Sequence, residues 1–123
     1  MQTMTPTQIV TAYTQKRGTD PRKILRAMKK DVHDGTGLVL HTNNSVLFVH
    51  HIGNQDAELH LFSEDSPLQL MQSLKEFIKH IRDSHLRAVY GRADNEGIVR
   101  FLKKAGVDVQ PSDKSTYNWM ALV

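Results

Sequence analysis

Three consecutive strand-like segments lie in the middle of the chain, and they restrict the possible folds more than any other feature. Residues 37–42 (GLVLHT) and 45–51 (SVLFVHH) are separated only by Asn43-Asn44. Asparagine tolerates the positive φ angles that a two-residue hairpin turn requires. A third such segment, AELHLF, follows at 57–62 after a Gly-Asn turn signal. Segments joined by short turns pair in antiparallel fashion, so we predict an antiparallel meander.

Helical periodicity predicts two helices before the meander and one directly after it. Three prolines each follow a Thr, Asp or Ser, at Pro6, Pro21 and Pro67, and this pattern is typical of helix starts. Apolar residues then recur three and four positions apart, which places them on one helix face. The helix after the meander is predicted over 67–83. The remaining elements are predicted as a strand at 86–91, a helix at 95–104, and strands at 107–110 and 117–123. The predicted order is ααβββαβαββ.

Length and composition are those of one soluble globular domain. The chain has 123 residues, of which 39% are hydrophobic and 24% charged, and we expect a single domain spanning 1–123. No apolar run approaches the ~18 residues of a membrane span, so we expect no membrane partner. Cysteine is absent, which excludes disulfides, thiolate metal sites and cysteine nucleophiles. This composition fits a reducing compartment, and we expect a cytoplasmic location, with a phage virion or the cytoplasm of an infected host as the alternative.

Basic residues are concentrated between residues 16 and 30. This segment holds seven of the chain's 16 basic residues and one of its 13 acidic residues. Such a patch can attract phosphate groups or an acidic protein surface, although a solvated helix face is the alternative interpretation. No aromatic residue is interleaved with it, so base stacking is not indicated and nucleic-acid binding would be salt-sensitive. The candidate partner-binding residues are Arg22, Lys23, Arg26, Lys29 and Lys30.

The stretch DNEGIVRFLKKAGVDV, residues 94–109, carries a family resemblance. Together with the predicted element order, it resembles the GNAT fold of acetyl-CoA-dependent N-acetyltransferases, whose usual form here is N-x-x-A-x-x-F/L-Y-x-K-x-G-F. The matching positions are Asn95, Ile98, Phe101, Lys104, Gly106 and Val107. The resemblance implies an α/β fold with a mixed, mostly antiparallel sheet and helices on both faces. It also implies acetyl-CoA as the cofactor and an amine as the acceptor.

The resemblance further implies where the cofactor binds. Its expected contacts are the backbone of Leu61, Phe62 and Ser63, the helix start from Ser66 to Leu68, and the side chains of Asn95 and Phe101. Two departures from the family pattern stand against this assignment. The loop before the helix, SEDSPL at 63–68, lacks the family's glycines and carries two acids, which would repel a pyrophosphate. Leu102 stands where many members have a tyrosine that acts as a general acid. Small GNAT-like proteins of tailed phages look similar in having a glycine-poor loop and an R-F-L-K-x-x-G helix.

The meander also supplies the candidate catalytic base. Strand alternation places Glu58 and His60 on one face of the third strand, opposite Leu59. A neighbouring carboxylate can tune an imidazole toward proton transfer at neutral pH, so Glu58 or His60 is the expected base. Imidazoles on these strands also allow a metal site as an alternative, although no H-x-x-x-H or H-E-x-x-H helix supports it.

Three functions remain open on the sequence. The first is an acetyl-CoA-dependent N-acetyltransferase acting on an amine. The second is a GNAT-fold protein of the phage-encoded kind that has lost catalysis and serves as a binding or structural module. The third, compatible with the second, is a binder of nucleic acid or an acidic protein through the cationic helix.

Overall fold

The computed structural model describes residues 3–92 and 96–123, which form four helices and one six-stranded sheet. The helices are α1 (Pro6–Lys16), α2 (Pro21–His33), α3 (Pro67–Arg82) and α4 (Glu96–Lys104). The strands are β1 (Gly37–Thr42), β2 (Ser45–Gly53), β3 (Asp56–Ser63), β4 (Ala88–Gly91), β5 (Val109–Pro111) and β6 (Trp119–Leu122). The observed order is the predicted one, and boundaries differ by one to two residues.

The sheet is mixed and mostly antiparallel, as predicted. Its strand order is β1-β2-β3-β4-β6-β5, so the last strand is inserted between β4 and β5. The β3–β4 pair is parallel, and the other four pairs are antiparallel. Asn43, at the β1–β2 turn, has a φ of 50°, which is the left-handed conformation expected of a hairpin asparagine.

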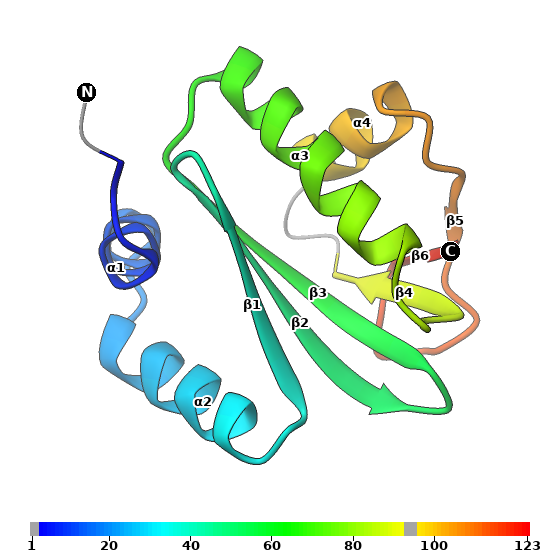
Figure 1. Cartoon of the computed structure of the whole chain (residues 1–123), viewed down its shortest axis with the longest axis horizontal. Helices are drawn as coiled ribbons and strands as arrows, with labels where there is room; N and C mark the ends of the chain where they lie inside the picture. The colour runs from blue at the N-terminus through cyan, green and yellow to red at the C-terminus, as the bar shows by residue number, and fades with distance from the viewer. Residues whose placement is uncertain (1–2, 93–95) are drawn as a thin grey trace.

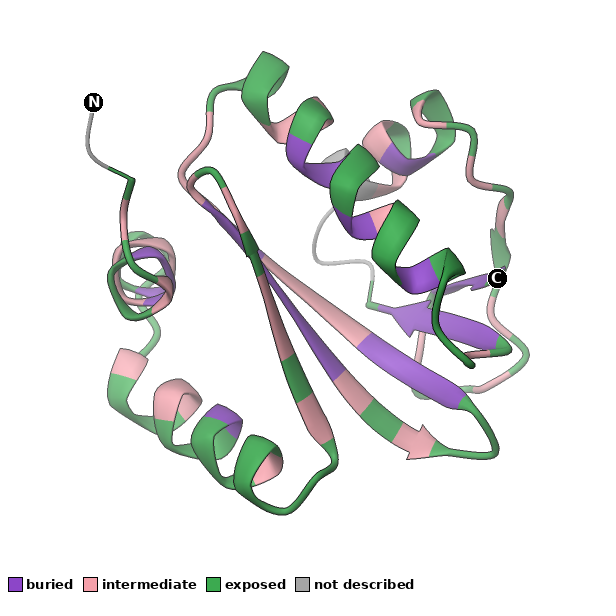
Figure 2. Ribbon diagram, in the orientation of Figure 1, coloured by how far each residue is buried: buried purple, intermediate pink, exposed green. Residues whose placement is uncertain are grey.

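Helices cover both faces of the sheet, with α1 and α2 on one side of the meander and α3 and α4 on the other (Figure 1). The larger core cluster lies under α3, where Leu74 and Phe77 pack with Leu47 of β2. The second cluster lies under α1 and α2, where Ile9 and Met28 pack with Phe48. Purple buried positions accordingly face the sheet, and green exposed positions face outward (Figure 2). Because β2 contributes to both clusters, its apolar run is continuous rather than alternating.

Each of the first three helices begins at the proline that the sequence indicates. Thr5 caps α1 with a capping box, in which its hydroxyl accepts from Gln8 N–H and its own N–H donates to Gln8 Oε1. Asp20 and Ser66 are the corresponding caps of α2 and α3. No helix in the described part of the chain combines the length and the apolar character needed to cross a bilayer.

The pairing between β3 and β4 is short, and this feature positions the candidate site. Three residue pairs join the strands, from Asp56 opposite Ala88 to Glu58 opposite Tyr90. Strand β3 then continues for five more residues to Ser63 along β2. In Figure 1 the far end of β3 runs away from β4 toward α1 and the start of α3. Beyond Glu58, the described parts of β3 and β4 are therefore no longer paired, and the sheet is open between them.

Candidate active site

A cavity of about 360 Å³ lies where β3 and β4 separate. Its walls come from both layers of the molecule: Tyr13 and Arg17 of α1, Leu59 to Phe62 of β3, Phe77 and Ile78 of α3, Gly91 and Arg92 after β4, Leu102 of α4, and Trp119 of β6, among others. The lining is mainly apolar, with a few polar side chains. Such a volume and composition fall within the usual range for small-molecule sites, about 300–1,000 Å³.

Glu58 lies at the point where the two strands part, because it belongs to the last residue pair between them. Its side chain is buried, and three polar side chains surround it. Its Oε1 contacts His60 Nε2, its Oε2 lies 3.9 Å from the Arg92 guanidinium, and the Tyr117 hydroxyl hydrogen-bonds to it. His60 and Arg92 also line the cavity. The two sequence-predicted candidates for the base are thus adjacent.

The pKa of Glu58 reflects opposing effects. Burial disfavours its charged form, but the hydrogen bond from Tyr117 and the charges of His60 and Arg92 outweigh burial and hold its pKa below the ordinary value of 4.5. Burial and the hydrogen bond to Glu58 raise the pKa of Tyr117 to about 12. At neutral pH, Glu58 is therefore an anion and Tyr117 a neutral hydrogen-bond donor.

A second histidine of the meander shares the face of Glu58 and His60 but has a different partner. His50 lies opposite Glu58 in the β2–β3 register, and its ring stacks on Phe48 with centroids 6.3 Å apart. Its Nε2 lies 3.8 Å from the carboxylate of Asp31 in α2. Within the described residues, no group of three or more His, Asp or Glu side chains could hold a metal ion.

The backbone of β3 presents polar groups to the cleft at alternate residues. Glu64 N–H donates to Asn44 C=O over 2.9 Å at the end of the β2–β3 ladder, so even-numbered β3 residues form the hydrogen-bonded pairs with β2. The N–H and C=O groups of Leu61 and Ser63 consequently point to the opposite edge, where the described β4 no longer pairs. The backbone of Phe62, also expected to bind cofactor, faces Val46 of β2.

Trp119 adds a polar group that the sequence did not suggest. The indole lines the cavity and is only 6% exposed, yet among the described residues its Nε1 has no hydrogen-bond partner. Trp119 pairs with Gly91 across β4 and β6, and its ring lies against that glycine. A buried N–H donor without an acceptor costs free energy, and the Nε1 edge of this ring lies over Gly91.

The loop between β3 and α3 is tied inward by its two acids. Asp65 accepts from Asn44 N–H at 3.0 Å, from Ser45 Oγ at 2.5 Å and from Ser73 Oγ at 3.0 Å. Glu64 forms an ion pair with Lys16 of α1 at 2.7 Å. Both acids of the loop therefore have partners elsewhere in the protein, and neither needs a ligand to satisfy it.

The other expected cofactor contacts are spread around the start of α3 and along α4. Ser66 is exposed, and its Oγ accepts from Gln69 N–H at 3.4 Å, while Leu68 is 73% exposed. Phe101 packs against the larger core cluster, and it is Leu102 that lines the cavity. Asn95 lies outside the described residues.

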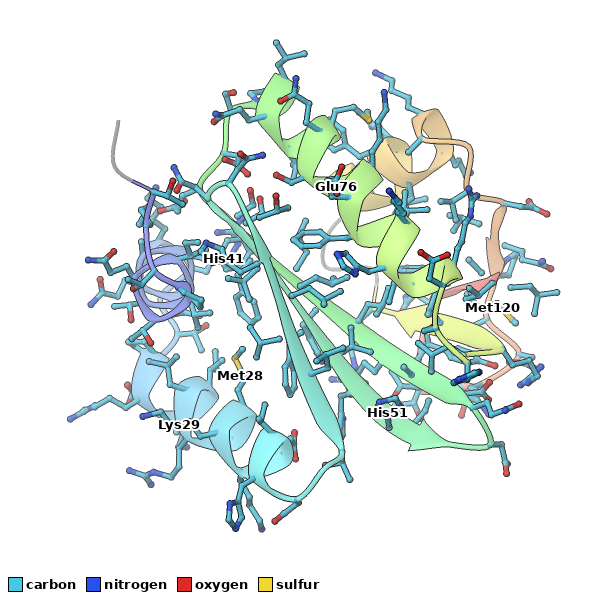
Figure 3. The ribbon with its side chains drawn as sticks, in the orientation of Figure 1. Met28, Lys29, His41, His51, Glu76 and Met120 are labelled. Carbon is cyan, nitrogen blue, oxygen red and sulfur yellow. The ribbon has the colours of Figure 1, made fainter. Side chains whose placement is uncertain are left out.

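All five candidate partner-binding residues of α2 are exposed: Arg22, Lys23, Arg26, Lys29 and Lys30. Figure 3 shows Met28 directed toward the sheet and Lys29 directed away from it. Arg22 also forms an ion pair with Asp20 at 3.3 Å. The α2 cationic face is thus separate from the cavity, which no residue of α2 lines.

Sequence reasoning missed Tyr117, Arg92 and Trp119 as parts of the site. Tyr117 falls within the predicted strand 117–123, and its spacing from β3 along the chain does not indicate a contact with Glu58. The insertion of β6 beside β4 brings both Trp119 and the preceding Tyr117 to the cleft. The available signal was the apolar, aromatic segment 117–123, and it predicted a final strand without indicating which strand it pairs with.

Comparison with known proteins identifies the fold. No family model matches the sequence, and no curated protein matches it. Among solved structures, the Campylobacter jejuni N-acetyltransferase PseH in complex with acetyl coenzyme A superposes with a TM-score of 0.60 at 15% identity, covering 98% of this chain and 92% of that one. Tetrahymena GCN5 gives a TM-score of 0.59 at 18% identity, and the match covers 94% of this chain and 81% of GCN5. Ard1 from Thermoplasma volcanium gives 0.53 at 16% identity, covering 98% and 92%.

Proposed function

We propose that this chain, whose fold is that of the GNAT acetyltransferases, transfers an acetyl group from acetyl-CoA to an amine. The observation that carries the proposal is the position of the Glu58–His60 pair. The pair lies where β3 and β4 stop pairing, beside the mainly apolar cavity between these strands. Acetyl-CoA binding by the structural neighbour PseH supports the choice of cofactor. Fold alone does not imply function, so the residues of the cleft are the argument.

The cleft fits the elongated arm of the cofactor. Its walls are apolar, and the Trp119 N–H together with the backbone groups of Leu61 and Ser63 can pair with amide groups. Acetyl-CoA would supply its acetyl group as a thioester, whose carbon–sulfur bond breaks as the new amide forms. The loop acids Glu64 and Asp65 would repel a pyrophosphate.

We assign the base to His60 rather than to Glu58. An attacking amine must give up a proton, and the best base has a pKa near the operating pH. The lowered pKa of Glu58 makes it a weak base, and it is His60, not Glu58, that lines the cavity. With Nε2–H of His60 donating to Glu58, Nδ1 is the nitrogen that accepts the proton. Glu58 orients the ring and stabilises the imidazolium, and Tyr117 and Arg92 hold Glu58 in place.

The test measures cofactor binding and acetyl transfer separately. Calorimetry would give the Kd of acetyl-CoA, and thiol release would report transfer to a polyamine, a lysine peptide and an amino sugar. We expect His60→Gln to lower kcat about 10²–10⁴-fold while leaving the Kd within a few-fold. His85→Gln, at an exposed histidine after α3, is the control and should retain full activity. Absence of acetyl-CoA binding at millimolar concentration would refute the proposal.

A second candidate function is a non-catalytic one through the α2 cationic face. The exposure of all five basic residues favours it, and an acidic protein surface or nucleic acid is the partner class. Binding of fluorescent polyglutamate or of a DNA duplex should then fall steeply with salt. The reversal Arg22→Glu, Lys23→Glu, Arg26→Glu should abolish it, whereas the matched reversal of exposed Lys75, Lys79 and Lys103 should not. Equal binding by the two triple variants would remove this candidate. A cytoplasmic or phage-related setting remains a prediction for either function.

A further inference from the structure

We propose that the donor thioester is recognised through its acyl-pantetheine arm and that its pyrophosphate contributes little to binding. This inference rests on the proposed acetyl transfer and adds a donor specificity to it. It follows from two parts of the same site, one that fits a ligand and one that opposes an anion. The expected consequence is that a truncated thioester, without nucleotide or pyrophosphate, binds about as well as acetyl-CoA.

The arm of the donor has matching groups in the cleft. Pantetheine is an extended chain with two amides, each offering a carbonyl acceptor and an N–H donor. Trp119 supplies a buried N–H that has no partner among the described residues. Beyond Glu58, the edge of β3 that no described strand pairs with supplies the N–H and C=O of Leu61. An extended ligand that adds to a strand edge in this way gains main-chain hydrogen bonds. The cavity volume of about 360 Å³ accommodates an arm of this kind.

The first turn of α3 offers few donors to a pyrophosphate. A helix N-terminus attracts anions through its unpaired N–H groups and its dipole. Here the first helical residue is Pro67, which has no N–H. The Ser66 side chain already accepts the N–H of Gln69. Two of the three N–H positions in the first turn are therefore absent or occupied.

The charges around this helix start also oppose an anion. Glu64 and Asp65 directly precede the cap, and both are half-buried. The donors nearest Asp65 are committed to its carboxylate, through Asn44 N–H, Ser45 Oγ and Ser73 Oγ. Lys16, the cation beside the loop, is 2.7 Å from Glu64. A pyrophosphate placed here would meet two carboxylates, and Lys16 is already paired with one of them.

The experiment compares acetyl-CoA with S-acetylpantetheine on the intact chain. Trp119 is the only tryptophan and lines the cavity, so its fluorescence reports occupancy directly, with calorimetry as a second readout. We expect the two Kd values to agree within about threefold. Acetyl-CoA binding at least 30-fold more tightly would overturn the inference and leave the proposed function standing. Binding of neither ligand at millimolar concentration would refute the proposed function itself and the inference with it.

Two substitutions sharpen the comparison. Glu64→Gln removes a loop charge and releases Lys16, so it should tighten acetyl-CoA binding several-fold and leave S-acetylpantetheine unchanged. Glu76→Gln, on the exposed face of α3 (Figure 3), is the matched control and should change neither. Trp119→Phe should weaken both ligands by a similar factor, about tenfold for one lost hydrogen bond, as read by calorimetry on protein with native circular dichroism. A loss confined to acetyl-CoA would contradict the role given to Trp119.

Discussion

The contact between Gly91 and Trp119 shows how one residue without a side chain shapes the cleft. An added Cβ at Gly91 would lie 2.2 Å from Cε2 and Cζ2 of the indole, a separation that carbon atoms do not tolerate. The glycine therefore leaves room for the tryptophan ring over β4, where the ring forms part of the cavity wall. Conformational freedom is not the reason for glycine here, because the constraint is the space that the ring occupies.

Gly91→Ala should destabilise the protein by about 1–3 kcal/mol, because the new methyl group overpacks the site. Urea denaturation would measure the free energy of unfolding. The control is Thr116→Ala at an exposed loop position, expected within about 0.5 kcal/mol of the parent. In a Trp119→Leu background the cost of Gly91→Ala should shrink, since the clashing ring is gone. An unchanged cost in both backgrounds would show that the ring is not the cause.

The lowered pKa of Glu58 predicts a pH-dependent stability contribution. A carboxyl group whose pKa is lower in the folded state stabilises the fold above its unfolded pKa, and this contribution is lost as pH falls through the folded value. The stability difference between parent and Glu58→Gln should therefore be larger at pH 7 than well below pH 4.5, the ordinary glutamate value. Urea midpoints at pH 7 and pH 3 measure it. If the stability difference between the two proteins instead grew as the pH fell, folding would not lower the pKa of Glu58.

At the scale of elements, the loop between β3 and α3 acts as a polar junction. Asp65 connects the β1–β2 turn at Asn44, the start of β2 at Ser45 and the second turn of α3 at Ser73. Asn43 reinforces this junction, because its side-chain amide donates to Ser73 Oγ at 3.1 Å. A carboxylate held by three donors is well satisfied, so this loop has a structural role that explains its acids.

Asp65→Ala should lower the free energy of unfolding by about 1.5–3 kcal/mol, because it leaves donors of Asn44, Ser45 and Ser73 without their charged acceptor. Chemical denaturation would measure the change. Asp83→Ala is the matched control, since Asp83 is exposed at the C-terminal end of α3, where an acid opposes the helix dipole. It should change stability by no more than about 0.5 kcal/mol. Equal losses of stability in the two variants would contradict the structural role assigned to Asp65.

At the scale of the whole molecule, the sheet consists of a meander half and a β4–β6–β5 half. Parallel pairing over three residues joins the halves, and α3 packs over both, with Leu47, Leu74, Val89 and Trp119 in one core cluster. Beyond Glu58 the described strands are separated by the cavity. A ligand bound there would contact both halves and add the connection that backbone pairing does not supply.

Acetyl-CoA should therefore raise the apparent Tm by several degrees. Ligand at 100 times its Kd stabilises a folded protein by about 2.7 kcal/mol, which is a large shift for a chain of 123 residues. Differential scanning fluorimetry over a cofactor series would measure it, with ATP as the control for nucleotide binding alone. S-acetylpantetheine should give a comparable shift when compared at equal multiples of Kd. A shift with ATP equal to that with acetyl-CoA would indicate a nucleotide or phosphate site outside the cleft.

Much of the fold was predictable because its determinants are local. Strand-like apolar segments joined by short turns placed the meander, the Asn43-Asn44 turn fixed its first register, and cap-plus-proline pairs marked three helix starts. The pairing of Glu58 with His60 was also predictable, since residues two apart on a strand share a face. The roles of Asp65 and Trp119 were not predictable, because Asp65 depends on Asn44 and Ser45, which lie 21 and 20 positions away, and Trp119 depends on Gly91 in another strand.

The sequence by itself determined the order and type of the elements, the faces of the helices and the position of a carboxylate–imidazole pair on β3. These properties follow from periodicity and capping, which act over a few residues. Only the tertiary structure decided that β6 enters between β4 and β5, that β3 and β4 part at Glu58, and that Tyr117 and Trp119 meet at that point. The physical reason is that strand order and cavities arise from packing between distant segments, and local residue patterns do not encode which distant segments meet.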